Sequence, residues 1–404
     1  MRIIYLHQYF HSSTDAGATR SLDFAKSWIE SGHSVDMITT DQNAKKFGFK
    51  WQKSIVEGIT VYKIPIPYSN HMGFAARILA FLTFSVASTL KVLTLKGELI
   101  FATSTPLTIA IPAIIGSRLK RIPMVFEVRD LWPEFPIAIG FLKNKFIILL
   151  AKLLAKSAYS QSSLIVTLSD GMARGIEQYD IPTEKIMIIP QGANAKDFQI
   201  DLGGGPNFRK KYGIPTNRPM VVFCGTLGFL SDVEFILDLA GEMQRVDPEV
   251  CFVIIGDGKN KPAAVRRVDS SETLKNNVIF LQEIPRNEVP KALSGADMAL
   301  ATIANFPEIR ACSAQNKVYD ALAAGTPIAI NYTGPLTDFI VAEDIGICIT
   351  ADNLSGSASL LAKTLRNSKW MNQAGNRCRF LAENNFDRHS LAKNLETEFF
   401  KLVG

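Results

Sequence analysis

Residues that could do chemistry follow directly after apolar runs in this chain. In MVFEVRDLWPEFP (124–136), an apolar run ends in Arg129 and Asp130, and Glu134 follows after Leu-Trp-Pro. Ligands bind at the carboxyl ends of buried parallel strands, and a carboxylate there can act as a general base or hold an acceptor hydroxyl. A pair of Arg129 with Asp130 or Glu134 that only braces the loop is the structural alternative.

A lysine and an aspartate three residues apart form a second candidate. In SAQNKVYDALAAGTPIAI (313–330), Lys317 and Asp320 stand at the start of a predicted helix that ends at Gly325, so they share one helix face. The lysine can pair with a diphosphate, and the carboxylate can accept hydrogen bonds from ribose hydroxyls. A surface ion pair between the two is the alternative.

Two turns of small residues follow predicted strands. The loop from Ser12 to Thr19 leads from the run 3–7 into a helix with Arg20 in its first turn, and the turn 225–228 (Gly-Thr-Leu-Gly) follows the run 219–225. Small residues let a backbone approach a ligand, and amides at a helix start favour anions. Each segment is equally compatible with an ordinary turn.

Apolar runs alternate with helical patterns along the whole chain, which indicates parallel sheets buried on both faces. The predicted strands are 3–7, 35–40, 59–66, 99–104, 123–128, 164–169, 186–190, 219–225, 250–256, 278–284, 298–303, 327–332 and 345–350. A stretch rich in Gly, Pro and charge interrupts the pattern at 201–219. We therefore predict the α/β fold class, with two doubly wound domains and a cleft between them.

The expected domain boundaries follow from that interruption. We predict a first domain over 1–200, a linker over 201–218, a second domain over 219–387 and a final helix over 388–404. The length of 404 residues suits two domains of this kind, and 47% hydrophobic with 20% charged residues is the composition of a large globular core. Disorder, collagen and coiled coil are thereby excluded.

Several motif searches are negative. The sequence has no phosphate-binding G-x-x-x-x-G-K-[ST], no G-x-S-x-G, no H-E-x-x-H and no Asp-x-Asp. The glycine cluster IIGDGKNK (254–261) lacks the third glycine of a dinucleotide fingerprint, which disfavours an oxidoreductase. The five cysteines are scattered without a C-x-x-C pair, so no metal site is predicted. The net charge of +6 includes no basic tract, so we expect no nucleic acid partner.

Two segments of the first half could contact a membrane. The N-terminal apolar stretch is too short for a signal peptide, and the uncharged stretch 78–90 is shorter than the ~20 residues of a span, so no transmembrane helix is predicted. The segments 71–96 and 141–159 combine apolar residues with basic ends, and Lys145, Lys152 and Lys156 share a helix face. Such helices lie in membrane interfaces; an internal helix with a solvated lysine edge is the alternative.

The ordered set of segments YLHQYF, GATRSLDFA, GHSVDMIT, FEVRDLWPE, LSDGMARGI, IPTEKIMIIPQGAN, CGTLG, IIGDG and NKVYDALAAGTPI resembles bacterial glycosyltransferase family 4. Within it, the chain is most similar to the N-acetylfucosamine-type transferases of O-antigen and capsule assembly. The resemblance covers nearly the whole sequence. It implies a GT-B fold, with two Rossmann-like domains facing across a central cleft and a final helix that crosses back to the first domain.

The resemblance also assigns roles to residues of this sequence. It implies catalytic roles for Asp130, Lys317 and Asp320, and an acceptor side formed by Arg129, Asp130 and Glu134. The charge on the leaving phosphate would be met by Lys317, with Arg310 or Arg20, and by amides of the Gly225 turn. The implied donor-binding residues are Gly17, Thr19, Arg20, Gly225, Thr226, Leu227, Gly228, Gly256, Gly258, Glu283, Ile284, Arg310, Asn316, Lys317 and Asp320.

Four positions depart from the family pattern. Gly17 stands alone where two adjacent glycines are usual, and Asp320 replaces a longer glutamate. Cys312 occupies the position eight residues earlier, where a second glutamate is expected. No Arg or Lys directly follows Gly228.

The function that we expect is a retaining glycosyltransferase that needs neither metal nor cofactor. It would move a sugar, an N-acetylated or deoxy hexose, from a UDP-sugar to a lipid-diphosphate-linked saccharide in bacterial surface polysaccharide biosynthesis. The expected location is cytoplasmic, peripheral on the anionic inner face of the cytoplasmic membrane. Three other functions stay open on the sequence: a nucleotide-sugar epimerase or hydrolase, a dinucleotide oxidoreductase, and a non-catalytic partner subunit on the membrane surface.

Overall fold

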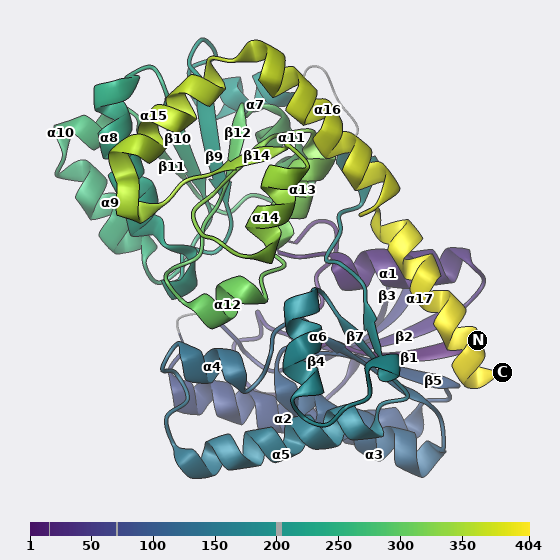
Figure 1. Cartoon of the computed structure of the whole chain (residues 1–404). Helices are drawn as coiled ribbons and strands as arrows, with labels where there is room; N and C mark the ends of the chain where they lie inside the picture. The colour runs from purple at the N-terminus through teal and green to yellow at the C-terminus, as the bar shows by residue number, and fades with distance from the viewer. Residues whose placement is uncertain (16, 70–71, 199–203) are drawn as a thin grey trace. The chain divides into compact units, whose positions relative to one another are not determined.

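The computed structural model describes residues 1–15, 17–69, 72–198 and 204–404, and the chain divides into two compact units (Figure 1). Unit 1 comprises Met1–Ser12, Thr19–Pro190 and His389–Gly404, and unit 2 comprises Ser13–Ala18 and Gln191–Arg388. Ala16 of the predicted loop, His71 of the predicted segment 71–96 and residues 201–203 of the predicted linker lie outside the described residues.

The division differs from the expected boundaries in two places, whereas the final helix follows the expectation. Unit 2 begins at residue 191, ahead of the predicted linker, and part of that linker is a helix, α7 (Gly204–Lys211). The short segment 13–18 belongs to unit 2, although the chain on both sides of it belongs to unit 1. The last helix, α17 (Arg388–Val403), belongs to unit 1 from residue 389 onward.

The sheet of unit 1 has the order β3-β4-β2-β1-β5-β6-β7-β8. Every pairing is parallel except that of β3 with β4. The strands are β1 (Arg2–Leu6), β2 (Ser34–Asp41), β3 (Gln52–Val56), β4 (Ile59–Pro65), β5 (Leu99–Thr103), β6 (Met124–Val128), β7 (Leu164–Thr167) and β8 (Ile186–Ile188). Strand β3 was not predicted, because this exposed edge strand lacks the apolar run that marks a strand buried on both faces.

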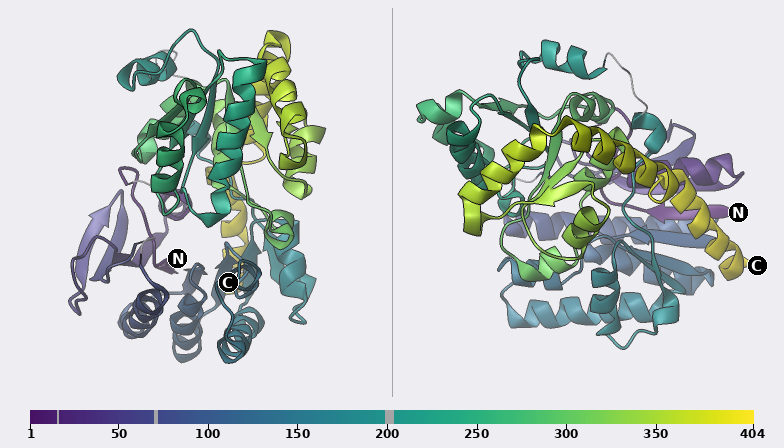
Figure 2. Two further views of the ribbon diagram at one scale, coloured as in Figure 1. Left: turned by 90° about the vertical axis from the view of Figure 1, so that its left-hand side faces the viewer. Right: turned by 45° about the horizontal axis from the view of Figure 1, so that its top comes forward.

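Helices cover both faces of this sheet because side chains alternate along each strand. Tyr5 and Phe101 point to the face of α1 (Arg20–Glu30) and α17, where Trp28 and Phe399 pack against Phe101. Three helices lie side by side on the other face (Figure 2): α2 (Phe74–Thr94), α3 (Ala110–Lys120) and α5 (Lys145–Gln161). Gly116 permits the contact of α3 with α2, since an added Cβ would lie 2.5 Å from Val92 Cγ1.

Short helices complete unit 1: η1 (Leu107–Ile109), α4 (Glu134–Ala138), α6 (Asp170–Glu177) and η2 (Thr183–Lys185).

The sheet of unit 2 is entirely parallel, in the order β11-β10-β9-β12-β13-β14. From β9 the strands run outward through β10 and β11 in one direction, and β12 to β14 follow in the other. The strands are β9 (Met220–Cys224), β10 (Cys251–Ile255), β11 (Val278–Leu281), β12 (Met298–Ala301), β13 (Ile328–Ile330) and β14 (Gly346–Cys348). The strand order therefore reverses between β9 and β12, which is where such sheets bind ligands.

Helices again cover both faces. Phe223 and Phe252 pack in one core with Leu237 of α8 and Leu361 of α15, while α11 and α13 lie against β9 and β12. Helices α15 and α16 are separate, and Asn367 caps α16 at the Trp370 amide. The helices are η3 (Ala195–Phe198), η4 (Phe229–Ser231), α8 (Val233–Val246), α9 (Lys261–Asp269), α10 (Glu272–Lys275), η5 (Arg286–Glu288), α11 (Val289–Ser294), α12 (Pro307–Ala311), α13 (Asn316–Ala324), α14 (Pro335–Ala342), η6 (Ala351–Asn353), α15 (Leu354–Leu365) and α16 (Ser368–Asn384).

Candidate functional site

A cavity of about 420 Å³ lies at the carboxyl edge of the unit 2 sheet, at the reversal between β9 and β12. All of its lining residues belong to unit 2. Apolar strand residues such as Val222, Ile255 and Leu300 line it, together with the turn after β9, the segment after β11 and the start of α13. The predicted donor residues that line it are Gly17, Gly225, Thr226, Gly256, Glu283, Ile284, Asn316, Lys317 and Asp320.

Two glycine turns meet in one wall of this cavity. Gly225 and Gly256 adopt φ values of 156° and 145°, and a Cβ on Gly256 would lie 2.0 Å from the carbonyl oxygen of Gly225. Only glycine permits so close an approach. The Gly225 amide donates to Ile255 O (3.0 Å) and the Leu227 amide to Asp257 O (2.8 Å). Two of the four turn amides expected to face a phosphate therefore bind carbonyls at the end of β10 and just after it.

Lys317 reaches into the cavity from the first turn of α13. Its ammonium nitrogen lies 3.8 Å from the centroid of the Phe223 ring. Among the described residues, no carboxylate forms an ion pair with it. Burial lowers the pKa of Lys317 to about 7, and burial raises the pKa of the neighbouring Cys224 thiol to about 11. The cavity thus holds a lysine that has an aromatic face beside it and, in the described part of the chain, no carboxylate paired with it.

The carboxylate of Asp320 does not pair with Lys317. Arg286 binds it through both terminal nitrogens, at 2.5 and 2.7 Å, and the two side chains are 12% and 8% exposed. This contact replaces the surface ion pair that the spacing of residues 317 and 320 allowed. Arg286 was not among the predicted site residues, although its place just after a predicted strand was a usable signal.

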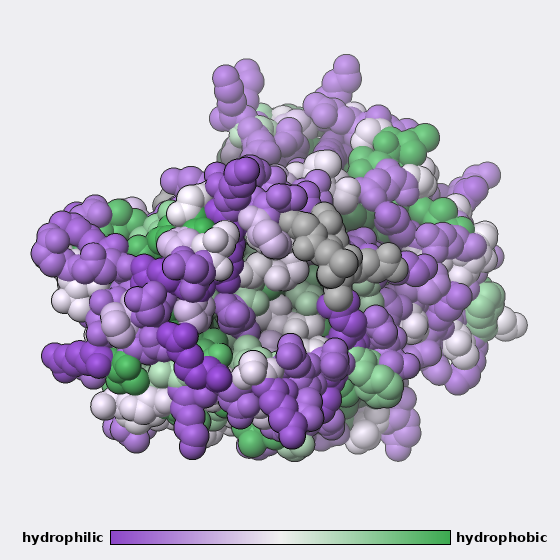
Figure 3. Space-filling view, turned by 90° about the horizontal axis from the view of Figure 1, so that it is seen from above, coloured by the Kyte–Doolittle hydropathy of each residue, from purple (hydrophilic) through white to green (hydrophobic). Residues whose placement is uncertain are grey.

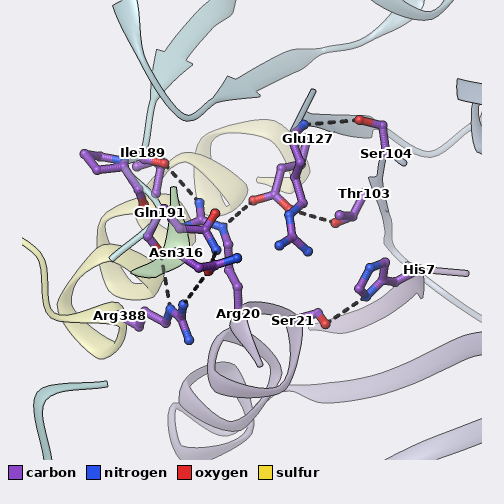
Figure 4. Close-up of polar contacts among 12 residues, drawn as sticks. His7, Arg20, Ser21, Thr103, Ser104, Glu127, Ile189, Gln191, Asn316 and Arg388 are labelled. Carbon is purple, nitrogen blue, oxygen red and sulfur yellow. Dashed lines mark hydrogen bonds and ion pairs between the residues drawn. The ribbon is translucent and has the colours of Figure 1, made fainter. Parts of the chain in front are cut away.

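Asn316, the first residue of α13, lines the cavity but also holds other residues of unit 2. Its Oδ1 accepts hydrogen bonds from Gln191 Nε2 and from Arg388 Nη2 (3.2 Å), and Arg388 Nε donates to Gln191 O (Figure 4). Asn316, a predicted donor-binding residue, is therefore hydrogen-bonded to Gln191 and Arg388, the first and last residues of the long segment of unit 2.

Lys261 does not line the cavity, but it binds the backbone of segments that do, and it was not predicted either. Its ammonium group donates to Gly256 O (2.7 Å), Leu281 O (2.8 Å) and Gln282 Oε1 (3.0 Å). Burial lowers the pKa of Lys261. These bonds fix the glycine turn relative to the segment that carries Glu283.

Two arginines expected near the diphosphate bind protein oxygens. In unit 1, Arg20 is fully buried, donates to Glu127 Oε1 (2.8 Å), and reaches the carbonyls of Ile189 and Pro190 (Figure 4). In unit 2, Arg310 donates to Ile303 O (2.9 Å) and neighbouring oxygens.

The other predicted donor residues also lie away from the cavity lining. Thr19 donates to Asp23 in α1. Leu227 is buried, and Gly258 packs against its carbonyl, which an added Cβ would approach to 2.6 Å. The residues concerned are Thr19, Arg20, Leu227, Gly228, Gly258 and Arg310.

The predicted acceptor-side residues follow β6 in unit 1. Thr105 Oγ1 donates to Asp130 Oδ2 (2.8 Å), and Tyr179 Oη donates to Glu134 Oε1 (2.5 Å). In the described part of the chain, Arg129 forms an ion pair with neither carboxylate, so the pair that would only brace the loop is not formed.

His7 was not predicted for this edge. Its Nδ1 lies 2.8 Å from Ser21 Oγ, and burial, helped by the charge of Arg129, holds its pKa well below the usual range. His7 is therefore neutral at physiological pH.

No group of three or more His, Cys, Asp or Glu side chains that could hold a metal occurs among the residues that the structure describes.

Helices α2 and α5 expose apolar side chains. On α2, Phe84 and Ser88 are buried, whereas Val86 and Leu90 are 65% and 63% exposed. On α5 the exposed apolar side chains are Phe146, Ile147, Leu149, Leu150 and Leu153. By contrast, the face drawn in Figure 3 is mostly hydrophilic, with hydrophobic side chains in small separate patches.

The stretch 75–94 of α2 is long and apolar enough for a membrane span by length and composition, with 33% of its most apolar part buried. No span was predicted from the sequence, because Arg77 and Lys91 limited the uncharged stretch. The helix runs through both residues.

Two family models match the chain. The glycosyl transferase 4-like domain matches residues 16–192, and the glycosyl transferases group 1 domain matches residues 205–379. An uncharacterized glycosyltransferase of Methanocaldococcus jannaschii is 22% identical over 334 residues, which cover 81% of this chain and 80% of that protein. The alpha-monoglucosyldiacylglycerol synthase of Acholeplasma laidlawii is 23% identical over 355 residues, which cover 82% of this chain and 81% of that protein.

Solved structures show the same architecture. HepE of Anabaena, crystallised in complex with UDP and glucose, superposes with a TM-score of 0.73 at 16% identity, and the match covers 100% of both chains. This likeness confirms the predicted α/β fold of two Rossmann-like units.

Proposed function

We propose that this chain, which is a glycosyltransferase of the GT-B fold, moves a sugar from a UDP-sugar to a lipid-diphosphate-linked saccharide. The observation that carries the proposal is Lys317: a lysine in a ligand-sized cavity, beside an aromatic ring and without a paired carboxylate in the described part of the chain. A diphosphate supplies the counter-ion that such a group needs. The matched families and the UDP held by HepE support a nucleotide sugar as its source.

In the proposed reaction, negative charge develops on the phosphate that Lys317 binds. Transfer breaks the bond between C1 of the sugar and the oxygen of the β-phosphate and forms a bond between C1 and the acceptor hydroxyl oxygen. Negative charge grows on the leaving β-phosphate, which takes the proton of that hydroxyl. Lys317 meets this charge, and the backbone at Thr226, which lines the cavity beside it, adds a dipole. Asp320 accepts the ribose hydroxyls. We propose that the reaction retains the anomeric configuration and that these groups, rather than a metal, balance the charge.

The acceptor side is proposed at the carboxyl edge of unit 1. Asp130, which Thr105 orients, would hold the acceptor hydroxyl, and Arg129 and Glu134 follow the same strand. We propose an N-acetylated or deoxy hexose as the sugar and bacterial surface polysaccharide, such as O-antigen or capsule, as the product. The name of the Acholeplasma relative, a synthase of a glycosylated diacylglycerol, is compatible with an acceptor anchored in lipid.

A lipid-linked acceptor requires the enzyme to reach a membrane surface. The exposed apolar side chains of α2 and α5, with Lys145 and Lys152 on α5, fit an interface of apolar tails and anionic headgroups. We propose peripheral binding to the inner face of the cytoplasmic membrane. Flotation with phosphatidylglycerol vesicles tests it: Leu82→Glu with Leu150→Glu should abolish binding, whereas Leu360→Glu on α15 should not.

The first test of the function is a thermal-shift series of the purified chain with UDP, GDP, ADP, CMP and NAD in the presence of a chelator. Stabilisation by UDP alone supports the proposal, and UDP release from UDP-sugars with an undecaprenyl-diphosphate saccharide then identifies the donor. Stabilisation by NAD, or hydrolysis of the donor at the same rate without acceptor, contradicts it.

A further inference from the structure

Arg286 joins three separate segments of unit 2. Its guanidinium binds both oxygens of Asp320, and it lies over the ring of Phe198, 5.4 Å from the centroid. Its backbone amide donates to Asp15 O (3.3 Å). One residue thereby contacts the start of α13, the helix η3 and the segment 13–18.

One of these three contacts, with Asp320, lies in the lining of the cavity. Arg286 and Asp320 both line the cavity, and Gly17 and Ala18, close in sequence to Asp15, line it too. The contact with buried Phe198 places the guanidinium over an aromatic ring. The position of Arg286 is therefore set on one side by an aromatic ring and on the other by a carboxylate.

The Asp320 carboxylate can accept further hydrogen bonds while Arg286 is bound to it. Its two oxygens offer about four lone-pair directions, and a bidentate arginine uses one on each oxygen. No other side-chain hydrogen bond to Asp320 occurs in the described part of the chain, so the other two directions are available for two adjacent hydroxyl groups. The plane of the Asp320 carboxylate is set by the group that binds both of its oxygens, and that group is Arg286.

We propose that Arg286 is a positioning residue that orients Asp320 to read the vicinal 2′,3′-hydroxyls of a ribonucleoside diphosphate. The inference rests on the proposed function, since it assumes that the cavity binds the nucleotide of the donor. It assigns the ribose selectivity of the site to a pair of residues rather than to Asp320 alone.

The experiment compares UDP with 2′-deoxy-UDP by calorimetry on the full chain. Hydrogen bonds to charged groups are worth about 1.5–3 kcal/mol, so the wild-type protein should bind UDP about ten- to hundred-fold more tightly. Arg286→Lys keeps the charge but loses the bidentate geometry. This variant should reduce the ratio of the Kd for 2′-deoxy-UDP to the Kd for UDP to within about threefold, mainly by weakening the binding of UDP.

Two further variants distinguish a role of Arg286 in orienting Asp320 from a role in folding alone. Asp320→Asn should lower the ratio as Arg286→Lys does, and the double variant should lower it no further, because the two residues act as one unit. Arg209→Lys is the matched control: Arg209 also pairs with an aspartate of unit 2, Asp297, but does not line the cavity. Its ratio should equal that of the wild type.

Each other outcome overturns the inference. An unchanged ratio in Arg286→Lys assigns Arg286 to the fold alone, and an equal loss for UDP and 2′-deoxy-UDP assigns it to the phosphates. If Arg286→Lys does not fold, an unchanged ratio in Asp320→Asn overturns the inference in its place. Failure of the wild type to bind UDP removes the proposed function, whereas binding without discrimination between the two nucleotides removes only this inference.

Discussion

The two sheets use the charged residues at their carboxyl edges differently. In unit 1 the buried cation Arg20 meets Glu127 and two carbonyls, so its charge is satisfied within the protein. In unit 2 Lys317 faces the ring of Phe223, and no ion pair engages it among the described residues. The first arrangement stabilises a fold; the second leaves electrostatic free energy to be gained from a ligand. The resemblance assigned both residues to the donor, but only Lys317 lines the cavity.

The largest effect should come from breaking the satisfied pair. Glu127→Ala leaves the charge of Arg20 buried without its counter-ion, so we expect the free energy of unfolding to fall by about 3–5 kcal/mol. Urea unfolding followed by tryptophan fluorescence measures it, because Trp28, Trp51 and Trp132 lie in unit 1. The double variant Arg20→Met with Glu127→Leu removes both charges and should lose less. A loss below about 1 kcal/mol in Glu127→Ala would show that the pair is unimportant.

Removing the unpaired cation should affect activity instead of folding. Lys317→Met keeps the apolar stem and removes the charge, so we expect kcat to fall by about 10²–10³, or ~2.7–4 kcal/mol. The midpoint of thermal unfolding should not decrease, because no ion pair is lost. Lys275→Met, at an exposed lysine of the same unit, is the control. Near-normal turnover by Lys317→Met would refute the site assignment.

The pH dependence of UDP binding should show whether the charge of Lys317 is available to the ligand. Burial holds the pKa of Lys317 at about 7 in the empty cavity. The lysine is charged below that pH and neutral above it, and only the charged form attracts the diphosphate. UDP affinity should therefore be flat below about pH 7 and fall by up to about tenfold per pH unit above it.

Calorimetry between pH 7 and 9 measures this decline, in a range where the terminal phosphate of UDP is already ionised. Lys317→Arg stays charged throughout and should bind UDP with a flat profile. A flat profile for the wild type as well would mean that the lysine is protonated in the empty cavity.

The smallest effect should appear on the unit 1 edge. Asp130→Asn keeps an oxygen for Thr105 but loses the negative charge. We expect the KM for the lipid-linked acceptor to rise by up to about tenfold, in line with the ~0.5–1.5 kcal/mol of a single hydrogen bond. UDP affinity should stay unchanged in titrations of the same variant. An unchanged acceptor KM would separate Asp130 from the acceptor.

Much of the fold follows from local patterns. Strands buried on both faces are apolar throughout, so all the strands of unit 2 and all but one of unit 1 could be located in the sequence. The edge strand β3 could not, since its exposed residues carry no such signal. The position of Lys317 at a helix start could be predicted too, because helix-capping and the spacing on one helix face are properties of neighbouring residues.

The partners of these residues are a different matter, because a charged side chain pairs with whatever the packing brings near it. Arg286 meets Asp320 across 34 residues of chain, and Arg20 meets Glu127 across 107. Spacing equally allowed a Lys317–Asp320 pair and a phosphate-binding Arg20. The sequence by itself determined the elements and the chemical types at their ends. Only the tertiary structure decided which charges are neutralised inside the protein and which face the cavity, because the order of strands in each sheet sets those distances.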